Sequence, residues 1–204
     1  MKKKRSSEEP IVSIPKENGK GIAMDFIASQ NDMNTSYYGG ATGVLASGLV
    51  WGMAGLVGIT VSNIASMVTL FIGGMLIFPF SILLSKMLKR SGKHASSNSL
   101  RHLAIESLGI LFVGLFLAFV IAQTQMTFFY PIMLLAIGTR YLTFQTIYGL
   151  KTYWLLGGTL ILAGTTSLFF NLQFIAGAVI GSGIEIAFSF LLFNLSKVKV
   201  AAAS

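Results

Sequence analysis

The sequence predicts an all-α membrane protein, a bundle of six transmembrane helices in one domain with both termini in the cytoplasm. The chain has 204 residues, of which 53% are hydrophobic and only 11% charged. This is about half the charged fraction of a soluble domain. The mean hydropathy of +0.73 also excludes an intrinsically disordered chain. The third observation, the placement of the 15 basic residues, follows from the spans below.

Residues 1–21 hold six basic side chains with Pro10 and Pro15, which predicts a flexible basic cytoplasmic tail. Residues 22–38 follow a helical period, with Phe26 and Ile27 on the apolar face and Asp25 and Asp32 opposite. We expect this amphipathic segment to lie in the membrane interface. The alternative is a solvated linker whose periodicity is accidental.

Polar turns divide the rest of the chain into spans. Residues 33–85 carry no charged side chain, and this stretch is too long for one span of about 20 residues. Ser62 and Asn63 divide it, and Asn63 is expected to cap the second helix. The same reasoning makes 39–196 one membrane domain followed by a cytoplasmic tail, 197–204, with spans at about 39–60, 64–85, 103–123, 127–148, 153–170 and 174–194.

The basic residues all fall on one side of these six spans. All 15 lie in the first tail, in the loop after the second span, around the turn between the fourth and fifth spans, or in the last tail. The turns near 62, 125 and 172 hold none. The positive-inside rule therefore places both termini in the cytoplasm and makes anionic lipid headgroups the expected partners of the basic face. The net charge of +8 then requires no nucleic-acid partner.

Glycines recur at a spacing of four in the first and last spans. Gly48 and Gly52 form one pair, and Gly177 and Gly181 form the other. Small residues at this spacing allow helix backbones to approach closely, which predicts helix packing. A ligand groove is the alternative, whereas a nucleotide-binding loop is excluded because no strand precedes the glycines.

Three charged residues lie inside spans, where charge is costly: Glu106, Arg140 and Glu185. Arg140 lies roughly 20 Å and Glu185 roughly 17 Å from the outer ends of their spans, at 1.5 Å per residue. These depths match, so we expect a buried Arg140–Glu185 pair. Glu106 is nearer the cytoplasmic end and is a second candidate partner for Arg140.

Neighbouring polar residues extend this candidate site. Thr143 lies near Arg140 on the fourth span, and Ser182 shares a face with Glu185 on the sixth. Together these residues predict a polar interior between the two spans. Two interpretations remain open, a substrate or proton site and an ion pair that only fixes helix order.

The residues that would support enzyme chemistry are mostly missing. The chain has no cysteine, and its two histidines, His94 and His102, have no carboxylate at metal-ligand spacing. No intramembrane serine has a histidine to activate it. We therefore expect no enzyme activity, no metal and no cofactor.

The stretch from Gly39 to Phe170 resembles a family of small bacterial integral membrane proteins known only as a domain of unknown function. The resemblance is carried by GGATGVLASGLVWGMAGLV (39–57), FPFSILLSKML (78–88), LAIES (103–107) and above all FYPIMLLAIGTRYLTFQTIYGLKTYW (129–154). It implies a multi-pass protein of the bacterial cytoplasmic membrane and brings no activity with it.

The leading functional hypothesis is a permease-like protein that handles a small solute, or the membrane subunit of such a system. The alternative is a membrane protein without transport activity that binds a protein partner, a second copy or lipid through its glycine-rich helix faces. A wet cavity between the fourth and sixth spans would favour transport, whereas a sealed interior with an exposed glycine groove would favour binding.

Overall fold

The computed structural model describes residues 18–201, with side chains described for 26–196. This part of the chain is all-α and has no strand. Seven α-helices and two short 3-10 turns follow one another: α1 (Asn18–Tyr37), η1 (Tyr38–Gly40), α2 (Ala41–Thr60), α3 (Asn63–Met87), α4 (Leu100–Ala122), η2 (Met126–Phe128), α5 (Phe129–Tyr148), α6 (Thr152–Phe169) and α7 (Phe174–Ala201).

A helix occupies each of the six ranges in which the sequence predicts a span. The predicted capping residue is wrong, however. Ser62 is the N-cap of α3, because its side chain accepts a hydrogen bond of 3.1 Å from the amide of Ala65. Asn63 is instead the first residue of the helix. The helix α7 also continues to Ala201, into the predicted last tail, whereas most of the predicted first tail lies outside the described residues.

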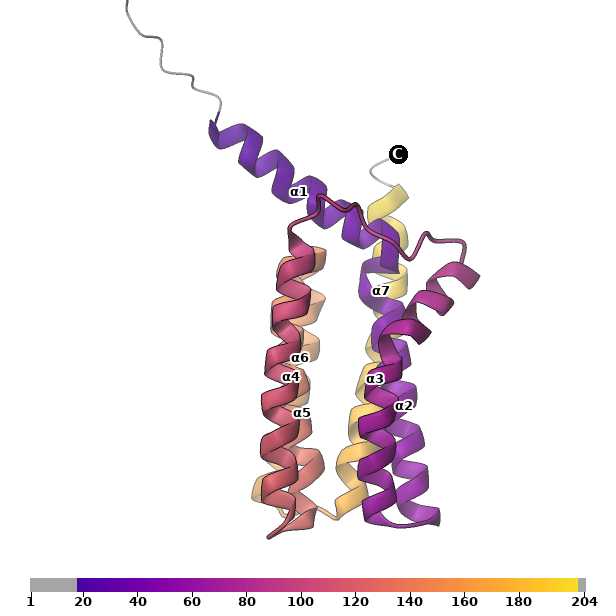
Figure 1. Cartoon of the computed structure of the whole chain (residues 1–204), viewed down its shortest axis with the longest axis vertical. Coiled ribbons are helices and arrows are strands. Elements are labelled where there is room, and N and C mark those ends of the chain that lie inside the picture. Colours follow the sequence, from indigo (N-terminus) through magenta and orange to yellow (C-terminus); the bar gives the residue numbers. More distant parts are fainter. Residues whose placement is uncertain (1–17, 202–204) are drawn as a thin grey trace, which may run out of the picture.

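The six helices from α2 to α7 form two groups of three. The most extensive contacts join α5 to α4 and α6, and join α2 to α3 and α7. Figure 1 shows α4, α5 and α6 side by side, with α2, α3 and α7 together beside them. Contacts between the two groups run mainly through α7, which packs against α5 and α6. We call the two groups the α2 group and the α5 group.

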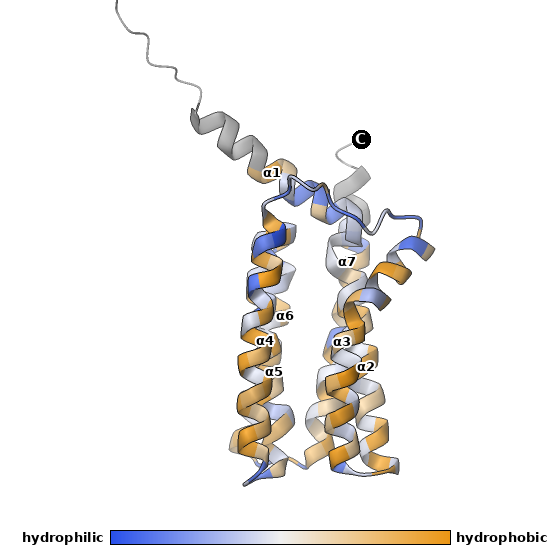
Figure 2. Ribbon diagram, viewed as in Figure 1, coloured by the Kyte–Doolittle hydropathy of each residue, from blue (hydrophilic) through white to orange (hydrophobic). Residues whose placement is uncertain are grey.

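The outer surfaces of the helices are apolar. Phe112 on α4, Met75 on α3 and Leu162 on α6 are each more than 60% exposed. Figure 2 shows hydrophobic residues along the helices and hydrophilic ones at both ends of the bundle. Within the described residues, four stretches are long and apolar enough to cross a membrane: Phe26–Thr60, Asn63–Met87, Leu100–Ala122 and Phe174–Ser196. A surface of this kind is stable against lipid and not against water.

The helices α5 and α6 are absent from those four stretches, and for α5 its position explains why. They have 20 and 18 residues, close to the length of a span. The helix α5 is the most enclosed helix and carries eleven buried residues. A helix with protein on most sides can hold polar residues such as Arg140 and Gln145, which are both half-buried, so its mean hydropathy is lower.

The helix α1 lies across one end of the bundle (Figure 1). Three consecutive left-handed residues, Tyr38, Gly39 and Gly40, turn the chain from α1 into α2. A side chain at Gly39 would come within 2.8 Å of Leu150, so only glycine fits there without rearrangement. Phe26 and Ile27 are 44% and 57% exposed, whereas Met33 and Tyr37 are buried against the bundle.

Polar side chains of α1 form hydrogen bonds with other parts of the chain. The carboxylate of Asp32 accepts hydrogen bonds from the amide of Ala95, at 2.9 Å, and from Nδ2 of Asn98, at 2.8 Å. Nε2 of Gln30 donates to the carbonyl of Thr146, and Nδ2 of Asn34 donates to that of Tyr148. The segment therefore ties the 88–99 loop to the end of α5, a role that its periodicity did not predict.

Candidate functional site

Glu185 lies at the centre of the candidate site. It is eleven residues into α7, about 17 Å from the start of that helix, and none of its surface is exposed. The hydroxyl of Tyr141 on α5 donates a hydrogen bond of 2.9 Å to Oε1. Ser47 of α2 lies beside the carboxyl group. The second oxygen, Oε2, is buried and has no hydrogen-bond partner among the described residues.

The predicted Arg140–Glu185 ion pair does not form. Among the described side chains, no basic nitrogen lies within 4.0 Å of the Glu185 carboxylate. Tyr141, the next residue along α5, takes the position beside Glu185. Depth alone suggested the pair, but adjacent residues of a helix point about 100° apart. The two helices are rotated so that the tyrosine, and not the arginine, faces α7.

Arg140 points instead toward α4. Its Nε donates to Oγ of Ser107 at 3.3 Å, and its guanidinium carbon lies 5.2 Å from the centre of the Phe144 ring. Glu106, the second candidate partner, is exposed and forms no ion pair with Arg140 in the described structure. Here too the adjacent residue, Ser107, occupies the predicted position. Arg140 therefore joins α5 to α4 within one group.

The two hydroxyl residues of the predicted site have local partners. Thr143 donates to the carbonyl of Arg140 at 2.8 Å, within its own helix. Ser182 donates to the carbonyl of Gly48 at 2.8 Å and so joins α7 to α2. Of the five predicted site residues, only Ser182 and Glu185 share an interface, and neither Arg140 nor Thr143 contacts it through the hydrogen bonds given above.

Tyrosine hydroxyls bridge the two helix groups at three levels. Near the start of α5, Tyr130 forms a hydrogen bond with Ser66 of α3. At mid-depth, Tyr141 reaches Glu185. At the end next to α1, Tyr153 of α6 donates to the carbonyl of Gly39 at 2.6 Å. The three tyrosines belong to the α5 group, and their partners lie in the α2 group or, for Gly39, in the turn that leads into α2. Directional hydrogen bonds therefore stabilise the contact between the two groups.

The tyrosines nearest α1 also pack on one another. The rings of Tyr141 and Tyr153 are 6.0 Å apart, and those of Tyr148 and Tyr153 are stacked at 5.6 Å. Phe144 contacts all three rings. This aromatic cluster lies between Glu185 and the α1 end of the bundle. The hydroxyl groups of these tyrosines are therefore polar groups within an otherwise apolar interior.

The predicted glycine pairs lie where helices of this chain meet. A Cβ atom on Gly48 would stand 3.1 Å from that of Glu185, and one on Gly52 would stand 2.9 Å from Oγ of Ser182. On α7, a Cβ atom on Gly177 would come within 2.5 Å of Tyr130, and one on Gly181 within 2.6 Å of Trp51. These close approaches bring the backbone of α2 against the Glu185 turn of α7.

The roles of Tyr141, Ser107 and Ser47 could hardly be predicted from the sequence. Tyrosine and serine are common in membrane helices, and none of the three stands out by charge. The one available signal was their position, adjacent to or level with a charged residue. Within the described residues no group of three or more histidine, aspartate and glutamate side chains gathers to hold a metal ion.

The fold and the site define a class, an all-α protein with apolar helices long enough to cross a membrane and a buried carboxyl group between them. Residues 26–195 match the model of a family of unknown function, DUF7010, and the chain belongs to that family. No curated protein and no solved structure matches the chain.

Proposed function

We propose that the protein crosses the cytoplasmic membrane of a bacterium six times, with both termini in the cytoplasm. The support is the distribution of basic residues together with six helices at the predicted positions. The helices α5 and α6 are counted as spans because they have 20 and 18 residues and pack against the apolar helices α4 and α7 and against each other. The exposed apolar residues Phe26 and Ile27 would rest in the interface.

Within that architecture, we propose a permease-like carrier of a small solute in which Glu185 binds and releases a proton. The observation that carries this proposal is the fully buried carboxyl group with one unpartnered oxygen at the junction of the two helix groups. An ionisable residue at such depth is costly, and in membrane proteins it commonly marks a transport or proton pathway.

Because of the position of Glu185, binding or release of a proton would affect the contact between the two helix groups. A carboxylate in this place lacks a cation within 4.0 Å among the described side chains, whereas the neutral acid needs none. Each change of protonation therefore changes the energy of the contact that joins α7 to α5. Because the α2 and α5 groups meet mainly along α7, that energy affects the relative position of the two groups. Carriers alternate access by rocking such groups about a central site.

The alternative, binding of a partner through glycine-rich faces, has less support. The four predicted glycines, Gly48, Gly52, Gly177 and Gly181, all approach residues of this same chain and are therefore used in its own helix packing. The proposal also includes no enzymatic step, in keeping with the absence of a nucleophile and base pair from the sequence.

Proteoliposomes that enclose a pH indicator test the proposal. Small solutes found bound to the purified protein by native mass spectrometry are added outside, and the internal pH is followed. Wild-type protein should move protons when its solute is added, and Glu185→Gln should abolish that movement. Glu106→Gln is the matched control because Glu106 is exposed. Equal proton movement by Glu185→Gln would overturn the role of Glu185.

A further inference from the structure

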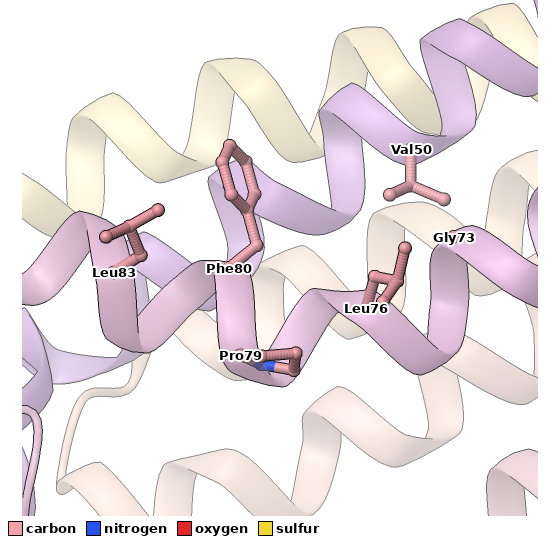
Figure 3. Close-up of a pocket in the computed structure, with 6 residues that line it drawn as sticks. All are labelled: Val50, Gly73, Leu76, Pro79, Phe80 and Leu83. Carbon is pink, nitrogen blue, oxygen red and sulfur yellow. The ribbon is translucent and has the colours of Figure 1, made fainter.

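An apolar groove of about 460 Å³ lies along α3 on the outer side of the α2 group. Figure 3 shows Phe80 and Leu83 on one side of Pro79, and Leu76 and Val50 on the other. Leu76 and Leu83 are 57% and 53% exposed, so the groove opens to the surroundings of the bundle. Its position on a span means that those surroundings are lipid.

The groove follows from the sequence of α3. Pro79 lies inside the helix, where it removes a backbone hydrogen bond and bends the axis. The last turns of α3 lean away from the bundle in Figure 1. At the other end, a Cβ atom on Gly73 would come within 2.5 Å of Val50, so the helices approach closely there. Beyond the bend, Thr42 of α2 still forms hydrogen bonds with Ser81 and Ser85 of α3, so the helices stay joined. The groove lies instead along the exposed face of α3, beside Val50.

Positive charge begins where the groove ends. Lys86 and Lys89 follow Leu83 within two turns, and both side chains are exposed. No acidic residue occurs between Asp32 and Glu106. The carboxylate of Asp32 is itself held by Ala95 and Asn98. The two lysines therefore have no anionic partner in the described structure.

The length of the groove matches one leaflet of a bilayer. From Gly73 to Leu83 the helix rises about 15 Å over ten residues. A hydrocarbon core is about 30 Å thick, so half of it is about 15 Å. The lysines then stand at the level of the lipid phosphates.

We propose that this groove binds an anionic glycerophospholipid, with one acyl chain along Leu76, Phe80 and Leu83 and the phosphate group at Lys86 and Lys89. The site rests on the membrane location of α3 and not on transport by Glu185. It differs from general attraction to a basic surface because the lysines and the groove are adjacent and must act together.

Native mass spectrometry of the full chain in a mild detergent tests this site. The probes are dioleoyl-phosphatidylglycerol and, with the same chains, dioleoyl-phosphatidylcholine. The doubly substituted variant Lys86→Gln/Lys89→Gln should weaken binding of phosphatidylglycerol by about tenfold or more and leave phosphatidylcholine unchanged. Filling the groove with Leu83→Trp should weaken the binding of both lipids. Because all three side chains are exposed, these variants should fold.

Two control variants complete the test. Lys151→Gln removes an exposed basic residue elsewhere, and Phe112→Trp enlarges an exposed apolar residue on α4. Neither should change lipid binding. The proposal fails if Lys86→Gln/Lys89→Gln binds phosphatidylglycerol as the wild type does, or if Lys151→Gln weakens it equally. It also fails if Leu83→Trp leaves the binding of both lipids unchanged, because the acyl chain would then lie elsewhere.

Discussion

Tyr141 on α5 donates a hydrogen bond of 2.9 Å to Oε1 of Glu185 on α7, and neither side chain is more than 5% exposed. The bond joins two groups of three helices at about the middle of their length. Within the part of the chain that the structure describes, Oε2 of the same carboxyl group has no hydrogen-bond partner. A buried polar group with unused hydrogen-bonding capacity raises the energy of the folded state. The position of this carboxyl group at the junction of the two helix groups is the basis of the proposed function.

Coupling between these two residues should exceed any coupling between Arg140 and Glu185. Tyr141→Phe and Glu185→Leu each leave a buried polar group unpaired, which typically costs about 1–3 kcal/mol. Removing both partners should cost less than the sum of the single changes, with a coupling energy of about 1 kcal/mol. The free energy of unfolding in detergent, followed with added denaturant, provides the cycle.

The matched cycle replaces Arg140 with Leu in place of the tyrosine change. Arg140 bonds to Ser107 and not to Glu185, so its coupling to Glu185→Leu should be smaller than that of Tyr141. Tyr38→Phe is a control for loss of a tyrosine hydroxyl, because the Tyr38 hydroxyl bonds to Leu88 at an exposed position. A larger coupling for Arg140 would mean that the ion pair forms after all.

Two glycines of α7 should respond oppositely to the same substitution. Gly177→Ala forces a Cβ atom to within 2.5 Å of Tyr130 and should lower the melting temperature in detergent. Gly183→Ala meets nothing within 4 Å. It should leave stability unchanged or raise it slightly, because alanine favours a helix by up to about 1 kcal/mol over glycine. Equal effects at both positions would show that α7 is rotated relative to this structure.

Asp32→Ala should loosen the 88–99 loop, while the bonds of Ser36 to Gly92 and Lys93 remain. The change removes the acceptor for the amide of Ala95 and for the side chain of Asn98. Trypsin should then cleave faster after Lys93, whereas Glu106→Gln, an exposed acidic residue, should leave the rate unchanged. Cleavage at the wild-type rate in Asp32→Ala would show that other contacts of α1 hold the loop.

Reporter fusions test the proposed topology. Fusions after residue 20, within 91–99 and at the C-terminus should report the cytoplasm. Fusions near residues 62, 125 and 172 should report the outside. The prediction follows from the placement of all 15 basic residues on one side. One fusion on the opposite side would require a different number of spans.

Helix positions could be predicted from the sequence because polar turns interrupt apolar runs. The turn at Ser62 and Asn63, and the basic loop after Lys86, divide the chain where the structure divides it. Length and hydropathy determine such boundaries, and neither depends on how the helices later pack. The prediction of α1 as a helix succeeded for the same reason, since periodicity is a local property.

The contacts of the site could not be predicted, because they depend on rotation about each helix axis. A rotation of about 100° exchanges Arg140 for Tyr141, or Glu106 for Ser107. Depth along the membrane, which the sequence does provide, is nearly the same for adjacent residues. The partners of Asp32 lie more than 60 residues away in a loop without periodicity, so the sequence placed its carboxylate in water.

The proposed transport role of Glu185 requires that its carboxyl group exchange a proton, and infrared difference spectroscopy measures this exchange directly. Protein in liposomes is cycled between two pH values at which it stays folded, in H2O and then in D2O. We expect a carboxylic acid C=O band that appears and disappears reversibly with pH, shifts in D2O, persists in Glu106→Gln and is absent from Glu185→Gln. If no band that depends on Glu185 responds to pH or to D2O, the carboxyl group is sealed and static, and the proposed role in transport is wrong.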